Sequence, residues 1–154
     1  MSIVRSVASS GLGFLLAVLW FDLMFDVQVR AHGSADSVPE SVLVSIAGYY
    51  RRVTTDARPM NRVVALAMLA TIGALVGEVV ADAAHRVAGS VALALAGIAI
   101  GLAGARTVRN AIRLGARTDP IADQSALARL IFRDHVACLV LVVVALIVHV
   151  FVSA

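Results

Sequence analysis

The stretch LVLVVVALIVHVFV, residues 139–152, carries a single polar side chain, His149. It belongs to the last of four apolar stretches, which cover residues 8–29, 61–81, 87–105 and 130–152. About 20 helical residues cross a hydrocarbon core of roughly 30 Å. Helices satisfy their own backbone hydrogen bonds in lipid, and the stretches lack the alternation of a transmembrane barrel. The sequence therefore predicts an all-α fold, a polytopic membrane protein whose four-transmembrane-helix bundle forms one domain over residues 1–154.

The composition agrees with a membrane protein. Of the 154 residues, 60% are hydrophobic and 15% are charged, against about 45–50% and roughly 25% in soluble domains. The net charge of +3 comes from 13 arginines without lysine. These flank the apolar stretches, so membrane orientation explains them and a nucleic-acid partner is not expected. Cys138 is the one cysteine, which excludes a disulfide within the chain.

The arginine distribution predicts the orientation, because cytoplasmic loops of membrane proteins are enriched in Arg and Lys. Arg5 and Arg86 alone lie on one side of the four stretches, and the other eleven arginines lie in or beside the two long loops. We therefore expect a multi-pass protein of the cell (cytoplasmic) membrane, with both long loops in the cytoplasm and both termini outside. Asp22 and Asp26 interrupt the first stretch, so we expect a retained helix and not a cleaved signal.

The long loops show helical patterns of their own. The stretch from Ser37 to Glu40 is typical of a capping box, and Tyr49 and Tyr50 close the apolar pattern that follows it. This predicts a short amphipathic helix in the first long loop, either docked on the bundle or in contact with lipid or a ligand. The third transmembrane helix is expected to continue to Gly115. Its extension carries a row of arginines on one face, which is expected to contact membrane lipid.

The third stretch is rich in small residues, which allow close helix packing in membranes. Gly97 and Gly101 form a Gly-x-x-x-Gly pattern within it. We interpret this pattern as packing inside the bundle, with a homo-oligomer through Gly97 and Gly101 as the alternative.

Polar residues within the stretches fall into two groups by depth. At 1.5 Å per residue, Asp22 lies about 12 Å from the boundary at Arg30, and Glu78 lies about 24 Å along the second helix from Arg62. An inner group is expected at the ends that border the long loops, and an outer group at the opposite ends. The inner group is Asp22, Asp26, Asn110, Arg113, Asp134, His135 and Cys138, and the outer group is Glu78, Asp82, His85 and His149.

The outer group combines carboxylates and imidazoles, the ligands with which helix bundles bind divalent metals. One interpretation is therefore a metal site formed by Glu78, Asp82, His85 and His149. The alternative places Asp82 and His85 in a solvated turn, has Glu78 hydrogen-bonded or paired with Arg86, and makes His149 a satisfied core histidine. The cofactor is otherwise unknown.

In the inner group, Asp22 and His135 are the candidate catalytic residues, because a carboxylate beside an imidazole serves as a proton relay or general base. Asn110, Arg113 and Asp26 are the candidate substrate-binding residues. A buried pair that only fixes helix packing is the alternative, and Asp26 and Asp134 also suit pairing with surface arginines.

The stretches RTVRNAIRLG, residues 106–115, and LARLIFRDHVACL, residues 127–139, resemble the second half of anthrone-oxygenase-like proteins, small four-helix membrane proteins. The resemblance implies Asn110 and His135 as pocket residues, with Arg113 less closely matched. Phe132 and Arg133 stand where that family has tryptophans. It further implies oxidation of polycyclic phenolic substrates, without a firmly assigned cofactor.

Three functions fit these observations. The first is binding or transformation of an apolar small molecule, with oxygenase-like chemistry as one form, in a polar pocket at the cytoplasmic side. The second is an oligomeric proton- or cation-linked transporter subunit that uses Asp22 and Glu78. The third is an accessory or assembly subunit whose polar residues hold a membrane complex together.

Overall fold

The chain folds into helices joined by short connections. The computed structural model describes residues 3–33 and 37–152, and it contains no strand within them. The elements are α1 (Ile3–Asp26), η1 (Val27–His32), α2 (Glu40–Arg51), η2 (Arg52–Asp56), α3 (Arg58–Ala81), α4 (Arg86–Leu102), η3 (Ala103–Thr107), α5 (Val108–Ala116), α6 (Ile121–Ile147) and η4 (Val148–Val152). The predicted all-α class is confirmed.

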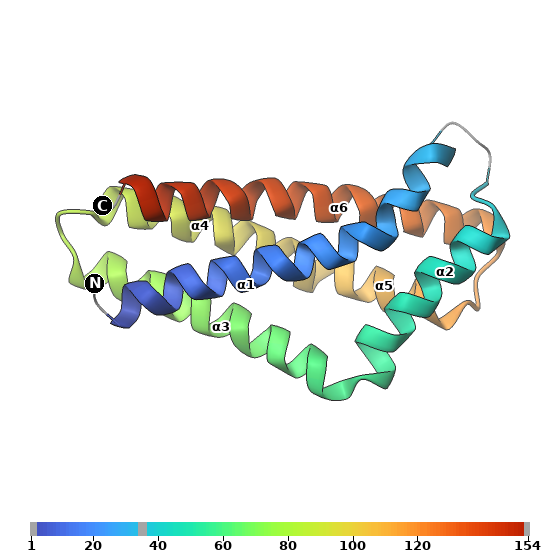
Figure 1. The fold of residues 1–154 in the computed structure, drawn as a ribbon, viewed down its shortest axis with the longest axis horizontal. Helices are drawn as coiled ribbons and strands as arrows, with labels where there is room; N and C mark the ends of the chain where they lie inside the picture. The colour runs from blue at the N-terminus through green and yellow to red at the C-terminus, as the bar shows by residue number, and fades with distance from the viewer. Residues whose placement is uncertain (1–2, 34–36, 153–154) are drawn as a thin grey trace.

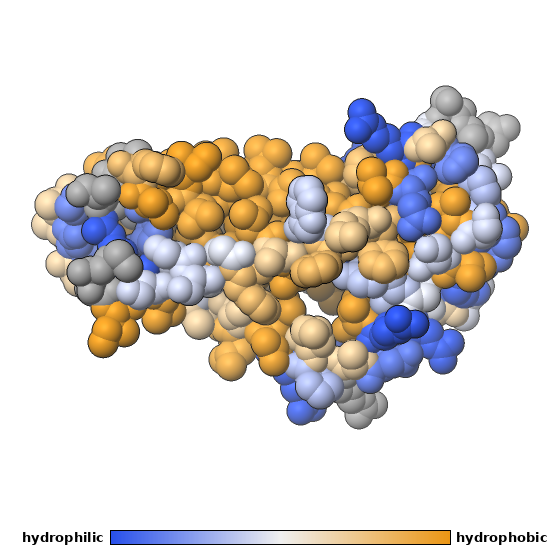
Figure 2. Space-filling view, in the orientation of Figure 1, coloured by the Kyte–Doolittle hydropathy of each residue, from blue (hydrophilic) through white to orange (hydrophobic). Residues whose placement is uncertain are grey.

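Four helical segments are long and apolar enough to cross a membrane, and the chain is a multi-pass membrane protein. The segments are Ile3–His32, Pro59–Ala81, Arg86–Ala116 and Ile121–Phe151. The third segment continues through η3 and α5, as the sequence predicts. Figure 2 shows apolar side chains along the long helices and hydrophilic ones gathered toward the ends of the molecule.

The four long helices form a closed ring in which α1 packs on α3, α3 on α4, α4 on α6, and α6 on α1. Figure 1 places α2 and α5 at one end of the bundle, which we call the loop end. The start of α1, the connection 82–85 and η4 lie at the opposite end, which we call the terminal end. The ring thus carries the inner polar residues toward the loop end and the outer ones toward the terminal end.

The ring closes over an apolar core in which small residues allow close approach. Leu12, Leu75 and Val142 are buried there, and a Cβ on Gly11 would collide with Thr71. On α4 the buried small residues are Ala88, Gly89, Ala92, Ala96 and Ala99.

The interpretation of Gly97 and Gly101 as bundle packing is wrong. Both are exposed, and a Cβ built on either would meet no atom within 4 Å in the described part of the chain. The orientation of α4 about its own axis turns its alanines inward and these glycines outward. A homo-oligomer through Gly97 and Gly101 stays a prediction.

The expected amphipathic helix is α2, and it is docked on the bundle. It begins at Glu40, and no side chain caps its first turn, so the capping box at Ser37 does not form. Its inward face is Leu43, Ile46, Ala47 and Tyr50. This face shares a core cluster with residues of α5 and α6, namely Ala111, Leu114, Leu127, Ala128 and Ile131.

Contacts hold α2 at both of its ends. Near its start, Val38 N–H donates to Ser125 Oγ over 3.0 Å, and Arg117 pairs with Glu40. Near its end, Gly115 of α5 lies so close that an added Cβ would be 2.8 Å from the backbone nitrogen of Arg51. These contacts fix the two tyrosines of α2 relative to α1 and α6.

Candidate functional site

A buried polar cluster joins α1, α2 and α6 near the loop end. Asp26, the last residue of α1, has an Oδ2 atom 2.6 Å from Nδ1 of His135 on α6. Tyr50 of α2 donates its hydroxyl to Asp26 Oδ1 over 2.6 Å. The Tyr50 oxygen also lies 3.3 Å from His135 Nδ1. Asp26 is fully buried, so these contacts satisfy a carboxylate that water does not reach.

Asp22 completes this cluster one helical turn earlier in α1. Its Oδ1 atom accepts a hydrogen bond of 2.7 Å from the hydroxyl of Tyr49. Its Oδ2 atom lies 3.7 Å from Nε2 of His135, beyond the usual hydrogen-bond range of about 2.7–3.2 Å. The side chain of Asp22 is 15% exposed, against 1% for Asp26. We call Asp22, Asp26, Tyr49, Tyr50 and His135 the inner cluster.

The two ring nitrogens of His135 therefore have different surroundings. An ionised carboxylate only accepts hydrogen bonds, so Asp26 fixes the proton on Nδ1. The tautomer of a neutral imidazole follows from such a bond, and Nε2 is then an acceptor. This arrangement allows His135 to take up or release a proton on the side that faces Asp22.

Tyr49 and Tyr50 serve as hydrogen-bond donors in this cluster. Burial, and then the nearby carboxylates Asp22 and Asp26, raise the pKa of both phenols well above the ordinary value. Both hydroxyls therefore stay protonated. The Tyr49 ring also stacks on Phe25, with 4.1 Å between ring centroids. The sequence places these tyrosines at the end of the amphipathic loop helix but does not reveal their role, because only the docking of α2 brings them to α1.

Asp134, one residue before His135, makes a separate ion pair. Arg106 pairs with it through two hydrogen bonds, of which the Nε–Oδ2 bond is 2.9 Å long. Thr107 donates its hydroxyl to the same Oδ2 over 3.2 Å. Asp134 is buried, whereas the side chain of Arg106 is 48% exposed. The expected pairing of Asp134 with a surface arginine is confirmed, but Asp26 pairs with His135 and Tyr50 instead.

The other predicted pocket residues do not join the inner cluster. Arg113 forms an exposed pair with Asp119, with bonds of 2.7 and 3.0 Å, in the turn before α6. Asn110 lies in α5, and its buried Nδ2 has no hydrogen-bond partner in the described part of the chain. Cys138 is buried, and its Sγ lies 3.5 Å from the carbonyl oxygen of Ala99. The expectation that Arg113 lies beside Asp22 is therefore wrong, and its role in substrate binding stays a prediction.

The outer residues form two pairs and not one group. His149 is buried, with Nδ1 3.2 Å from Glu78 Oε2 and Nε2 3.1 Å from Ser9 Oγ. Asp82 Oδ2 lies 2.9 Å from His85 Nδ1, and this hydrogen bond lowers the pKa of Asp82. Among the described residues, no three His, Cys, Asp or Glu side chains are placed to hold a metal ion. The predicted four-ligand metal site is not formed.

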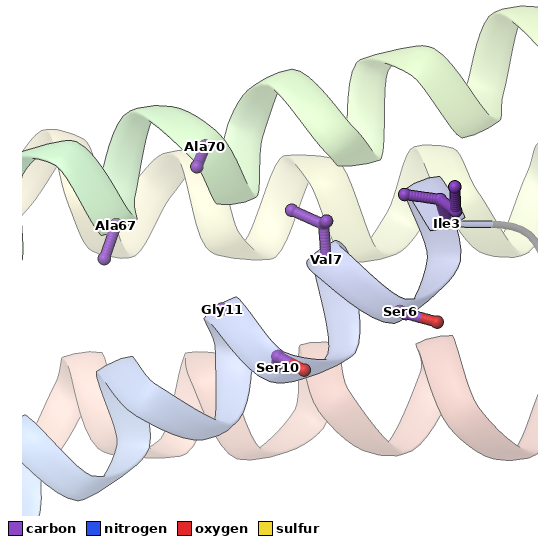
Figure 3. Close-up of a pocket in the computed structure, with 7 residues that line it drawn as sticks. All are labelled: Ile3, Ser6, Val7, Ser10, Gly11, Ala67 and Ala70. Carbon is purple, nitrogen blue, oxygen red and sulfur yellow. The ribbon is translucent and has the colours of Figure 1, made fainter.

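Two surface pockets lie away from the inner cluster. A groove of about 420 Å³ runs between α1 and α3. Figure 3 shows Val7 of α1 pointing toward α3, and Ala67 and Ala70 of α3 pointing toward α1. A smaller pocket of about 210 Å³ lies between α5 and α6, beside Arg113, Asp123 and Leu127. The groove carries no ionisable lining residue, and the smaller pocket has no histidine in its lining, so the carboxylate–imidazole pairs of the inner cluster are the candidates for acid–base chemistry.

Comparison of the chain with known protein families, with curated proteins and with solved structures finds no match. The resemblance of residues 106–139 to anthrone-oxygenase-like proteins therefore stays a prediction. The function is therefore inferred from the geometry of the inner cluster.

Proposed function

We propose that this membrane protein binds or transforms an apolar small molecule at the inner cluster, on the cytoplasmic side of the bundle. In this proposal His135 transfers protons, Asp22 contacts the ligand, and Asp26 and Tyr50 are positioning residues. One observation carries it: Asp26 binds Nδ1 of His135 while Nε2 faces the more exposed carboxylate of Asp22. A carboxylate that orients an imidazole, whose second nitrogen is then available, is a recurrent arrangement in acid–base catalysis.

The apolar character of the ligand is supported by what surrounds Asp22. Trp20 and Phe21 on the same helix are 63% and 59% exposed, and such rings suit contact with lipid or with an apolar molecule. Figure 1 shows α3 diverging from α1 toward the loop end, and Figure 2 shows the surface hollowed between these two helices. An apolar molecule could approach the polar cluster from the lipid along this side.

Asp22→Asn and His135→Gln variants test the proposal, with Asp56→Asn as the matched control. Asp56 is an exposed aspartate that pairs with Arg51. Each protein is purified in detergent, and the apolar molecules that copurify are extracted and measured by mass spectrometry. We expect a compound retained by wild type and by the control to be reduced at least about tenfold in both site variants, since hydrogen bonds to charged groups contribute about 1.5–3 kcal/mol. Equal retention by folded site variants would contradict the proposal.

An assembly role is the second candidate, favoured by the fact that the inner cluster ties three helices together. Under this alternative, Asp22→Asn lowers the melting temperature or releases a partner and leaves no ligand difference between folded proteins. A transporter subunit receives less support, because the core between the inner cluster and His149 is apolar, with Leu12, Leu15 and Val142 buried along it.

A further inference from the structure

We infer that the ligand of the inner cluster is a protonated amine with an apolar body, which binds in exchange for a proton. The inference rests on the proposed function, because it names the chemical class that the same cluster would take. It follows from two hydrogen-bond acceptors that face each other, His135 Nε2 and Asp22 Oδ2, at 3.7 Å.

Both atoms need a donor from elsewhere. Asp26 holds the proton on Nδ1 of His135, which leaves Nε2 with a lone pair. Tyr49 donates to the Oδ1 atom of Asp22, so Oδ2 keeps its accepting capacity. Nε2 and Oδ2 have no hydrogen-bond donor among the described residues, and His135 is more than nine-tenths buried. An ammonium group carries several N–H donors on one nitrogen, so it can serve both acceptors.

The charge of the cluster favours a cation. Asp22 and Asp26 contribute two negative charges when ionised, and a His135 whose Nε2 keeps its lone pair contributes none. No ion pair connects an arginine to either carboxylate in the described structure. The nearby Arg106 pairs with Asp134 instead. Buried charge must be neutralised, because an unpaired ion in a low-dielectric site is costly. A proton or a monovalent cation offsets one of the two negative charges.

The exchange leaves the net charge of the inner cluster unchanged. Before binding, the extra proton lies on His135 or Asp22. When the ammonium group binds, that proton leaves to solvent, and the N–H groups donate to Nε2 and Oδ2 without any covalent change. The stacked rings of Phe25 and Tyr49 lie beside Asp22 and offer an aromatic wall to the apolar body and to the cation. A neutral hydroxyl has one donor and no charge, so it would not replace the extra proton.

Calorimetric titration of the detergent-purified full chain tests this inference with two probes of similar shape, 2-phenylethylamine and 2-phenylethanol. An alkyl amine, like the Lys side chain with a pKa of about 10.4, is protonated near neutral pH. We expect the amine to bind at least about tenfold more tightly than the alcohol, as charge-assisted hydrogen bonds predict. Repeating the titration in buffers of different ionisation enthalpy should show proton release on binding.

Asp22→Asn should weaken the amine at least about tenfold, and Asp56→Asn should leave it unchanged. Thermal melting of each variant confirms that it is folded, and Tyr49→Phe offers a second, milder variant that should also weaken the amine. Tighter, Asp22-dependent binding of the alcohol would overturn the cationic class and leave the proposed function standing. Amine binding without proton release, or binding unchanged in Asp22→Asn, would overturn the exchange at this cluster. Failure of both probes would also overturn it, while the copurification experiment decides separately on the proposed function.

Discussion

At the scale of single residues, burial distinguishes two otherwise similar histidine–aspartate pairs. His135 is nearly fully buried and Asp26 is fully buried, so water cannot replace their hydrogen bond. Loss of this bond would leave buried polar atoms unpaired, which lowers the stability of the fold. His85 and Asp82 form an exposed pair of similar length at the terminal end. Exposed pairs contribute little to stability because water solvates both partners. The chemistry is the same, but only the buried pair constrains a proton.

The exposed pair gives a prediction about pH. Since the hydrogen bond from His85 lowers the pKa of Asp82 in the folded protein, the stabilisation is present above the unfolded-state pKa. It is lost as the pH falls through the lower folded-state pKa. Asp82→Asn should therefore lower the melting temperature slightly near neutral pH, and the difference from wild type should disappear as the pH falls below 3.8, the ordinary value. A difference that persists or grows in acid would contradict this account.

At the scale of elements, the position of α2 decides whether the inner cluster exists. Tyr49 and Tyr50 reach α1 because Leu43 and Ile46 are buried at the junction with α5 and α6. The periodicity of the sequence predicts this helix and its apolar face. It cannot predict which surface the face covers, because the docking partners are separated by long stretches of chain. For the same reason, helix rotation could not be predicted at Gly97, which faces outward.

Gly115→Ala should loosen α2. The new Cβ would lie 2.8 Å from the backbone nitrogen of Arg51 and 3.1 Å from its Cα, and backbone atoms cannot move aside as a side-chain tip can. We expect a loss of about 1–3 kcal/mol, typical of overpacking, and faster tryptic cleavage after Arg51.

Gly48→Ala is the matched control in α2 itself. A Cβ there meets no described atom within 4 Å, and alanine favours a helix over glycine. This variant should melt at or above the wild-type temperature. If Gly115→Ala were equally harmless, the close approach of α5 to α2 would be disproved.

At the scale of the whole molecule, composition and depth predicted the four membrane segments and the separation of the polar residues into two groups. The pairing within each group depended on three-dimensional packing. Asp26 and His135 lie 109 residues apart, and spacing alone favoured Asp22 as the histidine's partner. The outer group had the residue types of a metal site, but Glu78 faces His149 whereas Asp82 faces His85.

The predicted orientation can be tested by cysteine labelling in a Cys138→Ser background. Ala83 lies exposed in the connection 82–85, and Asp56 lies exposed at the loop end. A membrane-impermeant maleimide should label Ala83→Cys in intact cells, and it should label Asp56→Cys only after permeabilisation, because we propose that the arginine-rich loops are cytoplasmic. The opposite pattern would invert the topology while leaving the inner cluster intact.

The orientation of His135 by Asp26 can be measured by ¹⁵N NMR of the histidine ring in labelled protein. At about pH 9, above the ordinary pKa of histidine, a neutral ring carries its proton on one nitrogen only. We predict a protonated Nδ1 and an unprotonated Nε2 in wild type, and a mixture of tautomers in a folded Asp26→Asn variant. A proton on Nε2 in wild type, or a spectrum unaffected by Asp26→Asn, would contradict it.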